Sequence, residues 1–258
     1  MILTRLDDYQ SWQVSYAGTS ILIDPWLTAD PIGGSFDRRH EGRYAGLDEI
    51  RTSDLNVAAI LLCTSVNDHL RPDTLRAMTD TPVLGTSASA RLARRLGVRD
   101  ARAVRPGDSH AFECREGGRL TVTATRTGLP LGIIAIGWLI EAQDAAGSMC
   151  GRLWIEPHQP TRATAKSLAP LDVAILPAES VTAVVLPVTA RPAVAAEAAT
   201  AAGARRVVPT ATDPSRDMSA WQRAAYRVRG GIPDLRDALT EGIELVDLAA
   251  GESLAVSR

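Results

Sequence analysis

The order of short apolar runs along the chain constrains its fold more than any other feature. In the first half, alternating or wholly apolar runs separated by Gly, Pro or Asp indicate strands at residues 13–16, 21–24, 57–63, 120–127, 133–141 and 152–156. Helical patterns interrupt these strands at residues 72–78, which begin with proline, and at residues 87–96, which Gly97 follows. Much of this half is therefore predicted to be sheet.

After Pro160 the pattern changes to an alternation of helices and strands. Helices are predicted at residues 161–168, 192–202, 218–227 and 233–240, and strands at 172–176 and 206–208, with a last strand pair within 243–256. Two sheets covered by helices on their outer faces satisfy this order, which predicts an α/β (α+β) fold. No linker or repeat divides the chain, so residues 1–258 are predicted to form a single domain, and residues 25–46 a long loop of the kind that is often functional.

Composition excludes several classes of function. The 258 residues are 45% hydrophobic, which is ample for a core, and the formal net charge of −2 lacks the basic surplus that a nucleic-acid partner requires. The first residues carry acids in place of the basic start of a signal peptide, and no run approaches the roughly 20 apolar residues that span a bilayer. A cytoplasmic location without membrane attachment is therefore predicted. The single lysine among many arginines suggests a GC-rich bacterial genome.

Two segments carry a resemblance to a known family. Residues 11–27 read S-W-Q-V-S-Y-A-G-T-S-I-L-I-D-P-W-L, and residues 60–75 read I-L-L-C-T-S-V-N-D-H-L-R-P-D-T-L. Both resemble the metallo-β-lactamase superfamily, in its lactonase-like branch, and later segments at residues 137–141, 153–158, 171–177 and 206–210 follow in that family's order. The resemblance covers nearly the whole chain and implies a four-layer αβ/βα sandwich of the metallo-β-lactamase type.

The resemblance also implies a metal-binding motif, and this chain departs from it. In the family, an H-x-H-x-D-H turn supplies ligands to two metal ions that activate a water molecule. Here the four ligand positions are occupied by Thr64, Val66, Asp68 and His69. Valine cannot donate to a metal, and a threonine hydroxyl is a poor zinc ligand.

The later ligand positions are altered as well. They fall among Thr125, Arg126 and Thr127, near Glu156 and Pro157, and near Thr210 and Ala211. The whole chain contains four histidines, His40, His69, His110 and His158, so a histidine-rich two-metal centre cannot be assembled. The sequence therefore predicts no metal cofactor. The alternative is one zinc or manganese ion held by Asp68, His69 and Glu156.

Four residues are candidates for catalysis: Asp68, His69, Glu156 and His158. Glu156 and His158 lie at the end of a predicted strand, where an acid beside a histidine suits general acid–base chemistry. The alternative for these two residues is a surface turn started by Pro157. The competing interpretation of Asp68 is that it caps the helix that follows, with His69 hydrogen-bonded in the turn.

Two further residues are candidates for substrate binding. Arg126 is suited to hold an anionic group through paired hydrogen bonds, although a lone arginine beside a strand is more often solvated or ion-paired. Trp26 opens the long loop and is a candidate for lining an apolar pocket, although core packing is the more frequent role of a tryptophan. Cys63, Cys114 and Cys150 are odd in number and widely spaced, which is typical of reduced thiols rather than of disulfides or a metal knuckle.

Three functions remain open at this stage, and even enzyme status is undecided. The favoured one is a metal-independent protein of bacterial metabolism that binds or transforms a small molecule by acid–base chemistry. The second is a hydrolase with one metal ion acting on an ester, a lactone or a phosphate-bearing substrate, and the third is a non-catalytic binding or assembly partner. A small-molecule ligand is expected, and the sequence leaves a homo-oligomer open.

Overall fold

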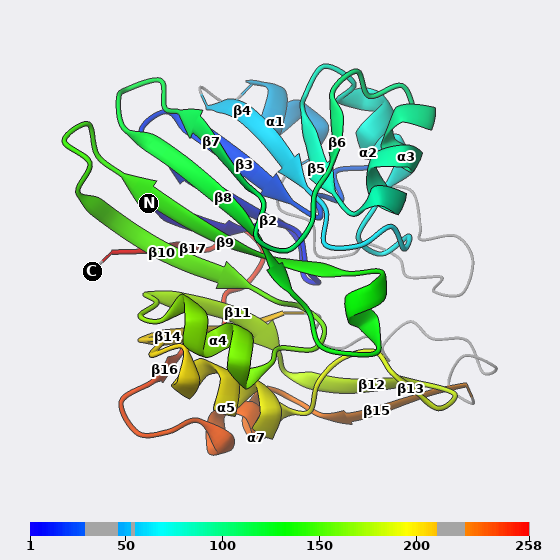
Figure 1. Ribbon diagram of the computed structural model, residues 1–258, viewed down its shortest axis with the longest axis vertical. Helices are drawn as coiled ribbons and strands as arrows, with labels where there is room; N and C mark the ends of the chain where they lie inside the picture. The colour runs from blue at the N-terminus through cyan, green and yellow to red at the C-terminus, as the bar shows by residue number, and fades with distance from the viewer. Residues whose placement is uncertain (29–45, 53–54, 211–224, 258) are drawn as a thin grey trace.

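The computed structural model describes residues 1–28, 46–52, 55–210 and 225–257, which form two seven-stranded sheets and a small third sheet (Figure 1). The first large sheet has the order β17-β1-β2-β3-β4-β5-β6. Its strands are β1 (Ile2–Arg5), β2 (Trp12–Tyr16), β3 (Thr19–Ile23), β4 (Asn56–Leu61), β5 (Val83–Gly85), β6 (Ala101–Ala103) and β17 (Ser253–Ala255). From β3 to β6 the strands are parallel, so their carboxyl ends lie at one edge.

The second large sheet has the order β16-β14-β11-β10-β9-β8-β7. Its strands are β7 (Ser109–Glu113), β8 (Arg119–Arg126), β9 (Ile136–Gln143), β10 (Met149–Ile155), β11 (Val173–Pro177), β14 (Arg206–Thr210) and β16 (Glu244–Leu245). The small sheet consists of β12 (Glu179–Ala183), β13 (Leu186–Pro187) and β15 (Tyr226–Gly230).

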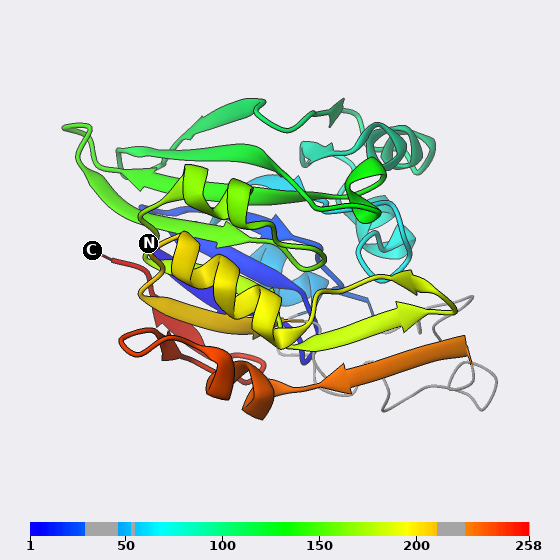
Figure 2. The same ribbon diagram turned by 60° about the horizontal axis from the view of Figure 1, so that its bottom comes forward.

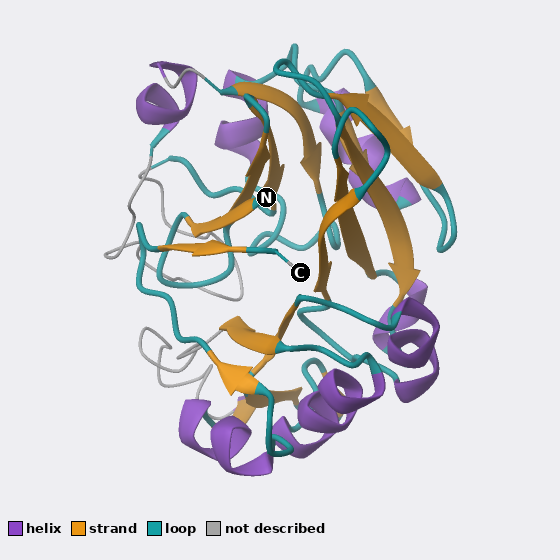
Figure 3. Cartoon of the chain, turned by 90° about the vertical axis from the view of Figure 1, so that its left-hand side faces the viewer, coloured by secondary structure: helices purple, strands orange, loops and turns teal. Residues whose placement is uncertain are grey.

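Helices cover the outer faces of both large sheets (Figure 3). The first group is α1 (Leu47–Thr52), α2 (Pro72–Ala77) and α3 (Ser87–Arg95), and the second is α4 (Arg162–Leu168), α5 (Pro192–Ala201) and α7 (Ile232–Ala238). Figure 2 shows α4 and α5 side by side across one face of the second sheet. No helix among the described residues is long and apolar enough to cross a membrane.

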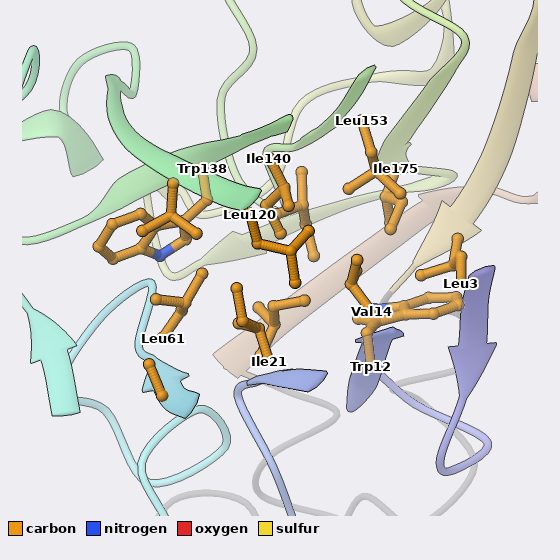
Figure 4. Close-up of a cluster of buried hydrophobic side chains, with 14 of the residues drawn as sticks. Leu3, Trp12, Val14, Ile21, Leu61, Leu120, Trp138, Ile140, Leu153 and Ile175 are labelled. Atoms are coloured by element: carbon orange, nitrogen blue, oxygen red, sulfur yellow. The ribbon is translucent and has the colours of Figure 1, made fainter. Parts of the chain in front are cut away.

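The core is built where the two sheets face each other. Leu3, Trp12, Val14, Ile21 and Leu61 project from the first sheet toward apolar residues of the second sheet (Figure 4). The partners from the second sheet are Leu120, Trp138, Ile140, Leu153 and Ile175. Separate apolar clusters join each sheet to its helices. These clusters produce four layers, and the predicted αβ/βα sandwich is confirmed.

Some predicted elements differ from the structure. The predicted strand at residues 133–141 begins only at Ile136, because Leu131–Ile133 form a 3-10 turn, η1. The predicted helix at residues 218–227 lies mostly outside the described residues, and its last two residues belong to β15, which pairs with β12. Most of the long loop predicted at residues 25–46 also lies outside the described residues.

The prediction that the last two strands pair with each other is wrong. Strands β16 and β17 both exist, but β16 pairs with β14 and β17 pairs with β1, so they belong to different sheets. Between them the chain crosses from one sheet to the other, and the buried guanidinium of Arg5 binds the carbonyl of Leu248 at 2.7 Å on the way. Tertiary contacts of this kind leave no periodic signal in the sequence.

Candidate functional site

A hydrogen-bonded pair of Asp24 and His69 forms the centre of the candidate site. Asp24 directly follows β3, and His69 lies on the turn between β4 and α2, so the parallel pairing of β3 with β4 brings both to one sheet edge. Asp24 Oδ2 and His69 Nδ1 are 2.8 Å apart, and both side chains are buried. The backbone N–H of Cys63 donates to Asp24 Oδ1 at 2.9 Å. Both oxygens of Asp24 are therefore engaged by the chain itself.

The backbone of Asp24 is unusual. Its φ is 45°, in the left-handed region that residues other than glycine rarely adopt. The hydroxyl of Ser11 donates to Asp7 Oδ2 at 2.6 Å, accepts the N–H of Trp26 at 3.0 Å, and lies 3.0 Å from the Asp24 carbonyl. The buried carboxylate of Asp7 also accepts the N–H groups of Tyr9 and Ser11. This network holds the strained residue in place, and such strain concentrates at functional sites.

A second buried group comes from the turn after β10. Glu156 is fully buried and accepts three hydrogen bonds: from the Thr127 hydroxyl at 2.6 Å, the His158 N–H at 3.1 Å and the Gln159 N–H at 3.3 Å. Burial raises the pKa of Glu156 to about 7, although these three bonds act to lower it. The carboxyl thus orients the turn that carries His158 and also titrates near neutral pH.

The Asp24–His69 pair meets the turn that carries Glu156 where the rings of His69 and His158 pack against each other. Their ring centroids are 4.7 Å apart, with an interplanar angle of 31°. Burial alone would lower the pKa of His69, but the carboxylates of Asp24 and Asp68 raise it above its ordinary value. Burial, and then the proximity of His69, hold the pKa of His158 well below its ordinary value. His158 is therefore neutral, and its buried Nδ1 has no hydrogen-bond partner within the described part of the chain.

The structure brings the four predicted catalytic residues together. Asp68 Oδ2 lies 4.0 Å from His69 Nε2 and accepts the Tyr9 hydroxyl at 3.3 Å, while His158 Nδ1 lies 3.9 Å from Glu156 Oε1. The alternative role of Asp68 as a helix cap is wrong, because the N-cap of α2 is Arg71 and has no side-chain capping bond.

The two predicted substrate-binding residues, Arg126 and Trp26, make the contacts described here with residues outside this cluster. The side chain of Arg126 is exposed, and its carbonyl accepts the Thr164 hydroxyl. Trp26 is buried beneath the guanidinium of Arg71, which lies 4.7 Å from the ring centroid, so it anchors the start of the long loop. Their proposed contacts with a ligand stay predictions.

One group of side chains has donors suited to a metal ion. Ligand atoms of Asp24, Cys63 and His69 all lie within 4.8 Å of one another. This set differs from the predicted set of Asp68, His69 and Glu156 and shares only His69 with it. Burial, followed by the charge of Asp24, raises the pKa of the Cys63 thiol well above its ordinary value, so the thiol is neutral when no cation is bound.

The remaining positions of the family motif are engaged in other contacts. Thr64 Oγ1 donates to the carbonyl of Ile134 at 3.1 Å, and Val66 is exposed. Thr125 and Thr210 accept the indole N–H groups of Trp154 and Trp12 at 3.1 and 3.3 Å. These hydroxyls therefore bind other parts of the chain.

Sequence reasoning missed Asp24, Cys63 and Thr127 as members of this site. A signal for Asp24 was present, because an acid directly after a buried strand and before Pro25 lies at a strand's carboxyl end. Thr127 falls among the later ligand positions of the family motif, and Cys63 carries no comparable signal.

Comparisons with known proteins agree with this architecture. A family model described as "Beta-lactamase superfamily domain" matches residues 6–211. A search of the curated proteins gives no significant match.

Several solved structures resemble the whole chain. An isothiocyanate hydrolase from Delia radicum gut bacteria is 18% identical, with a TM-score of 0.67 over 100% of this chain and 99% of that one. Igni18, a metallo hydrolase from the archaeon Ignicoccus hospitalis, is 14% identical, with a TM-score of 0.62 over 98% and 97% of the chains. CmlA, a diiron β-hydroxylase from Streptomyces venezuelae, is 18% identical, with a TM-score of 0.65 over 99% of this chain but 54% of its own. At these identities the likeness shows the fold.

The family match covers most of the chain, and the four-layer fold and the order of the motifs agree with it. The chain therefore belongs to the beta-lactamase superfamily domain family, within the metallo-β-lactamase superfamily.

Proposed function

We propose that this protein transforms a small molecule by metal-independent acid–base chemistry, with the Asp24–His69 pair as its base. The observation that carries this proposal is the buried 2.8 Å hydrogen bond between Asp24 Oδ2 and His69 Nδ1. A carboxylate bound to one imidazole nitrogen fixes the tautomer and stabilises the imidazolium that forms when the other nitrogen accepts a proton. The same bond turns Nε2 away from Asp24, toward Asp68 and the neighbouring loops.

The reaction class that suits this pair is hydrolysis. In the proposed step, His69 Nε2 takes a proton from a water molecule, whose oxygen attacks an ester or lactone carbonyl carbon. The bond to the leaving oxygen then breaks, and the proton on Nε2 passes to that oxygen. The named activities of two neighbours of the same fold, an isothiocyanate hydrolase and a metallo hydrolase, favour hydrolysis as the class.

Glu156 and His158 have supporting roles in this proposal. Neutral His158 packs against His69, and its buried Nδ1, 3.9 Å from Glu156 Oε1, has no hydrogen-bond partner in the described part of the chain, so the ring is proposed to position His69. Glu156 orients the turn that carries His158, through its bonds to the backbone N–H groups of His158 and Gln159. A small-molecule ligand, no nucleic-acid or membrane partner and a cytoplasmic location complete the proposal.

The contacts of the altered motif favour a reaction without a two-metal centre. Thr64, Thr125 and Thr210 use their hydroxyls in bonds to the chain, and Val66 offers no ligand atom. In the part of the chain that the structure describes, one group of donors lies close together, and its three ligand atoms, from Asp24, Cys63 and His69, suit one ion rather than two.

A second candidate is a hydrolase with one metal ion. Asp24, Cys63 and His69 would hold the ion, since a carboxylate, a thiolate and an imidazole are all zinc ligands and their atoms lie within 4.8 Å. When bound, the ion would polarise a carbonyl or lower the pKa of a bound water. The cluster fits one ion only if Cys63 is deprotonated, which burial opposes.

One experiment separates the two candidates. The protein, purified without an affinity tag, is assayed for metal by inductively coupled plasma mass spectrometry and for hydrolysis of 4-nitrophenyl acetate, with and without a chelator. The acid–base proposal predicts turnover that chelation does not change and that His69→Ala lowers by about 100-fold or more, within the range of general acid–base catalysis. Asp24→Asn is expected to lower kcat as well, because the imidazolium loses its counter-charge.

His110→Ala is the matched control, because His110 lies on the edge strand β7, where it pairs with Val122 of β8. Undiminished turnover in His69→Ala would refute the acid–base proposal. Retention of about one ion per chain, together with loss of turnover on chelation and in Cys63→Ser, would establish the one-metal candidate instead.

A further inference from the structure

Four exposed apolar side chains lie on the two loops that contribute to the candidate site. Most large apolar residues of the described chain are buried, but Val66 is 46% exposed, Leu129 78%, Ile133 81% and Ile134 47%. We call these four residues the apolar rim. A group of exposed apolar side chains usually marks a binding surface, whereas single exposed ones need no explanation.

Hydrogen bonds connect the rim directly to the site. Thr64 Oγ1 donates to the carbonyl of Ile134 at 3.1 Å, and the N–H of Ile136 donates to the carbonyl of Cys63 at 2.9 Å. The N–H of His69 donates to the carbonyl of Val66 at 3.0 Å. Val66 is therefore on the same turn as His69, and Ile134 is joined to the strand end that carries Cys63.

The other end of the rim is tied to Glu156. Residues 128–134 directly follow Thr127, which donates to Glu156, and the N–H of Gly128 donates to the carbonyl of Gln159 at 2.8 Å. Within this loop, Leu131 is buried and its carbonyl accepts the N–H groups of Ile134 and Ala135 at 2.9 Å each. Leu131 thus anchors the loop. The exposed side chains of Leu129, Ile133 and Ile134 do not contribute to this anchoring.

We propose that the apolar rim binds the apolar portion of the substrate, so that the substrate class is a neutral ester with an alkyl or aryl group beside the reacting carbonyl. This inference rests on the proposed function, because it assigns the reacting centre to His69. The rim would then contribute to specificity through the area of substrate that it removes from water.

Charge and area favour a small molecule over two larger occupants. Residues 64–70 and 127–136 contain no lysine or arginine and include Asp68, whereas an anionic lipid surface recruits basic side chains. A stable protein interface buries about 800 Å² on each partner, which takes many more residues than the four of the rim.

The test measures binding rather than turnover. Straight-chain primary alcohols from butanol to octanol serve as probes, and their dissociation constants are measured by NMR titration of the full chain. Full burial of one methylene strengthens binding about fourfold, so we expect affinity to rise by about three- to fourfold per methylene. The variants Val66→Ser and Ile133→Ser should flatten this dependence, and both should fold because the replaced side chains are exposed.

Ile2→Ser is the control, since Ile2 is 48% exposed on β1 and pairs with Ser15, at the opposite end of β2 from Trp12, which pairs with Ile23 beside Asp24. A chain-length dependence that survives in both rim variants would overturn the inference, and so would an equal loss in Ile2→Ser. Binding of the wild-type protein to phosphatidylcholine vesicles that both rim variants abolish would also overturn it, in favour of a lipid surface. His69→Ala should keep the dependence of alcohol affinity on chain length even if it abolishes turnover. Failure of the proposed chemistry can therefore be distinguished from failure of the rim inference.

Discussion

The buried carboxyl of Glu156 should make the stability of this protein depend on pH in an unusual direction. Its pKa is raised from an ordinary 4.5 to about 7 by burial. At pH values between these two pKa values, Glu156 is therefore protonated in the folded chain and ionised in the unfolded chain. The contribution to stability is fully present below pH 4.5 and is lost as the pH rises through about 7. Most buried acids that are ion-paired show the opposite trend.

The size of this effect follows from the same two values. Each pH unit between them corresponds to about 1.4 kcal/mol, so the whole difference is about 3 kcal/mol. Between pH 5 and pH 8 the expected loss in the free energy of unfolding is about 2–3 kcal/mol. No discount for solvent screening applies, because Glu156 is fully buried.

The assay is urea denaturation of the wild-type protein and of Glu156→Gln at pH 5 and pH 8. Glutamine has a similar shape and does not titrate, so the free energy of unfolding of the wild type should fall relative to that of Glu156→Gln by about 2–3 kcal/mol from pH 5 to pH 8. Glu197→Gln, at an exposed position of α5, serves as the control. A difference between wild type and Glu156→Gln that stays constant between the two pH values would refute the reasoning.

Three further substitutions test the packing around the site and the strain elsewhere. Gly137→Ala should destabilise the protein by about 1–3 kcal/mol in thermal unfolding, because the added Cβ would lie 2.6 Å from Thr125 Oγ1 and 2.7 Å from the Ile155 carbonyl; an unchanged melting temperature would contradict the close approach. Thr127→Val should raise the pKa of Glu156 further, as followed by carboxyl ¹³C NMR, because it removes the 2.6 Å bond that favours the ionised form; a lowered pKa would count against this bond. Val184→Gly should stabilise the protein by about 1 kcal/mol, since Val184 has a φ of 57° and relief of that strain exceeds the added chain entropy; a loss of stability would show that the valine packs in a way that its exposure does not suggest.

Local residue patterns predict the class of fold and point to four residues of the candidate site. Apolar runs of strand and helix period predict elements near their observed positions, because burial of one face imposes that period on the chain. The same runs place Glu156 and His158 after one strand and His69 after another, at the strand ends where a site is expected. The residues Thr64, Val66, Asp68 and His69 on the turn after β4 are also read directly from the sequence.

Which groups contact one another depends on long-range strand pairing, which local patterns do not reveal. Asp24 and His69 are 45 residues apart and meet because β3 and β4 align in parallel, and Thr127 and Glu156 are 29 residues apart and meet because β9 separates β8 from β10 by one strand. The pKa values of His69, His158 and Glu156 follow from burial and from these contacts, which depend on distances in space rather than on local sequence. The assignments of β16 and β17 to different sheets were likewise decided by long-range pairing, since two short strands carry too little local pattern to specify a partner.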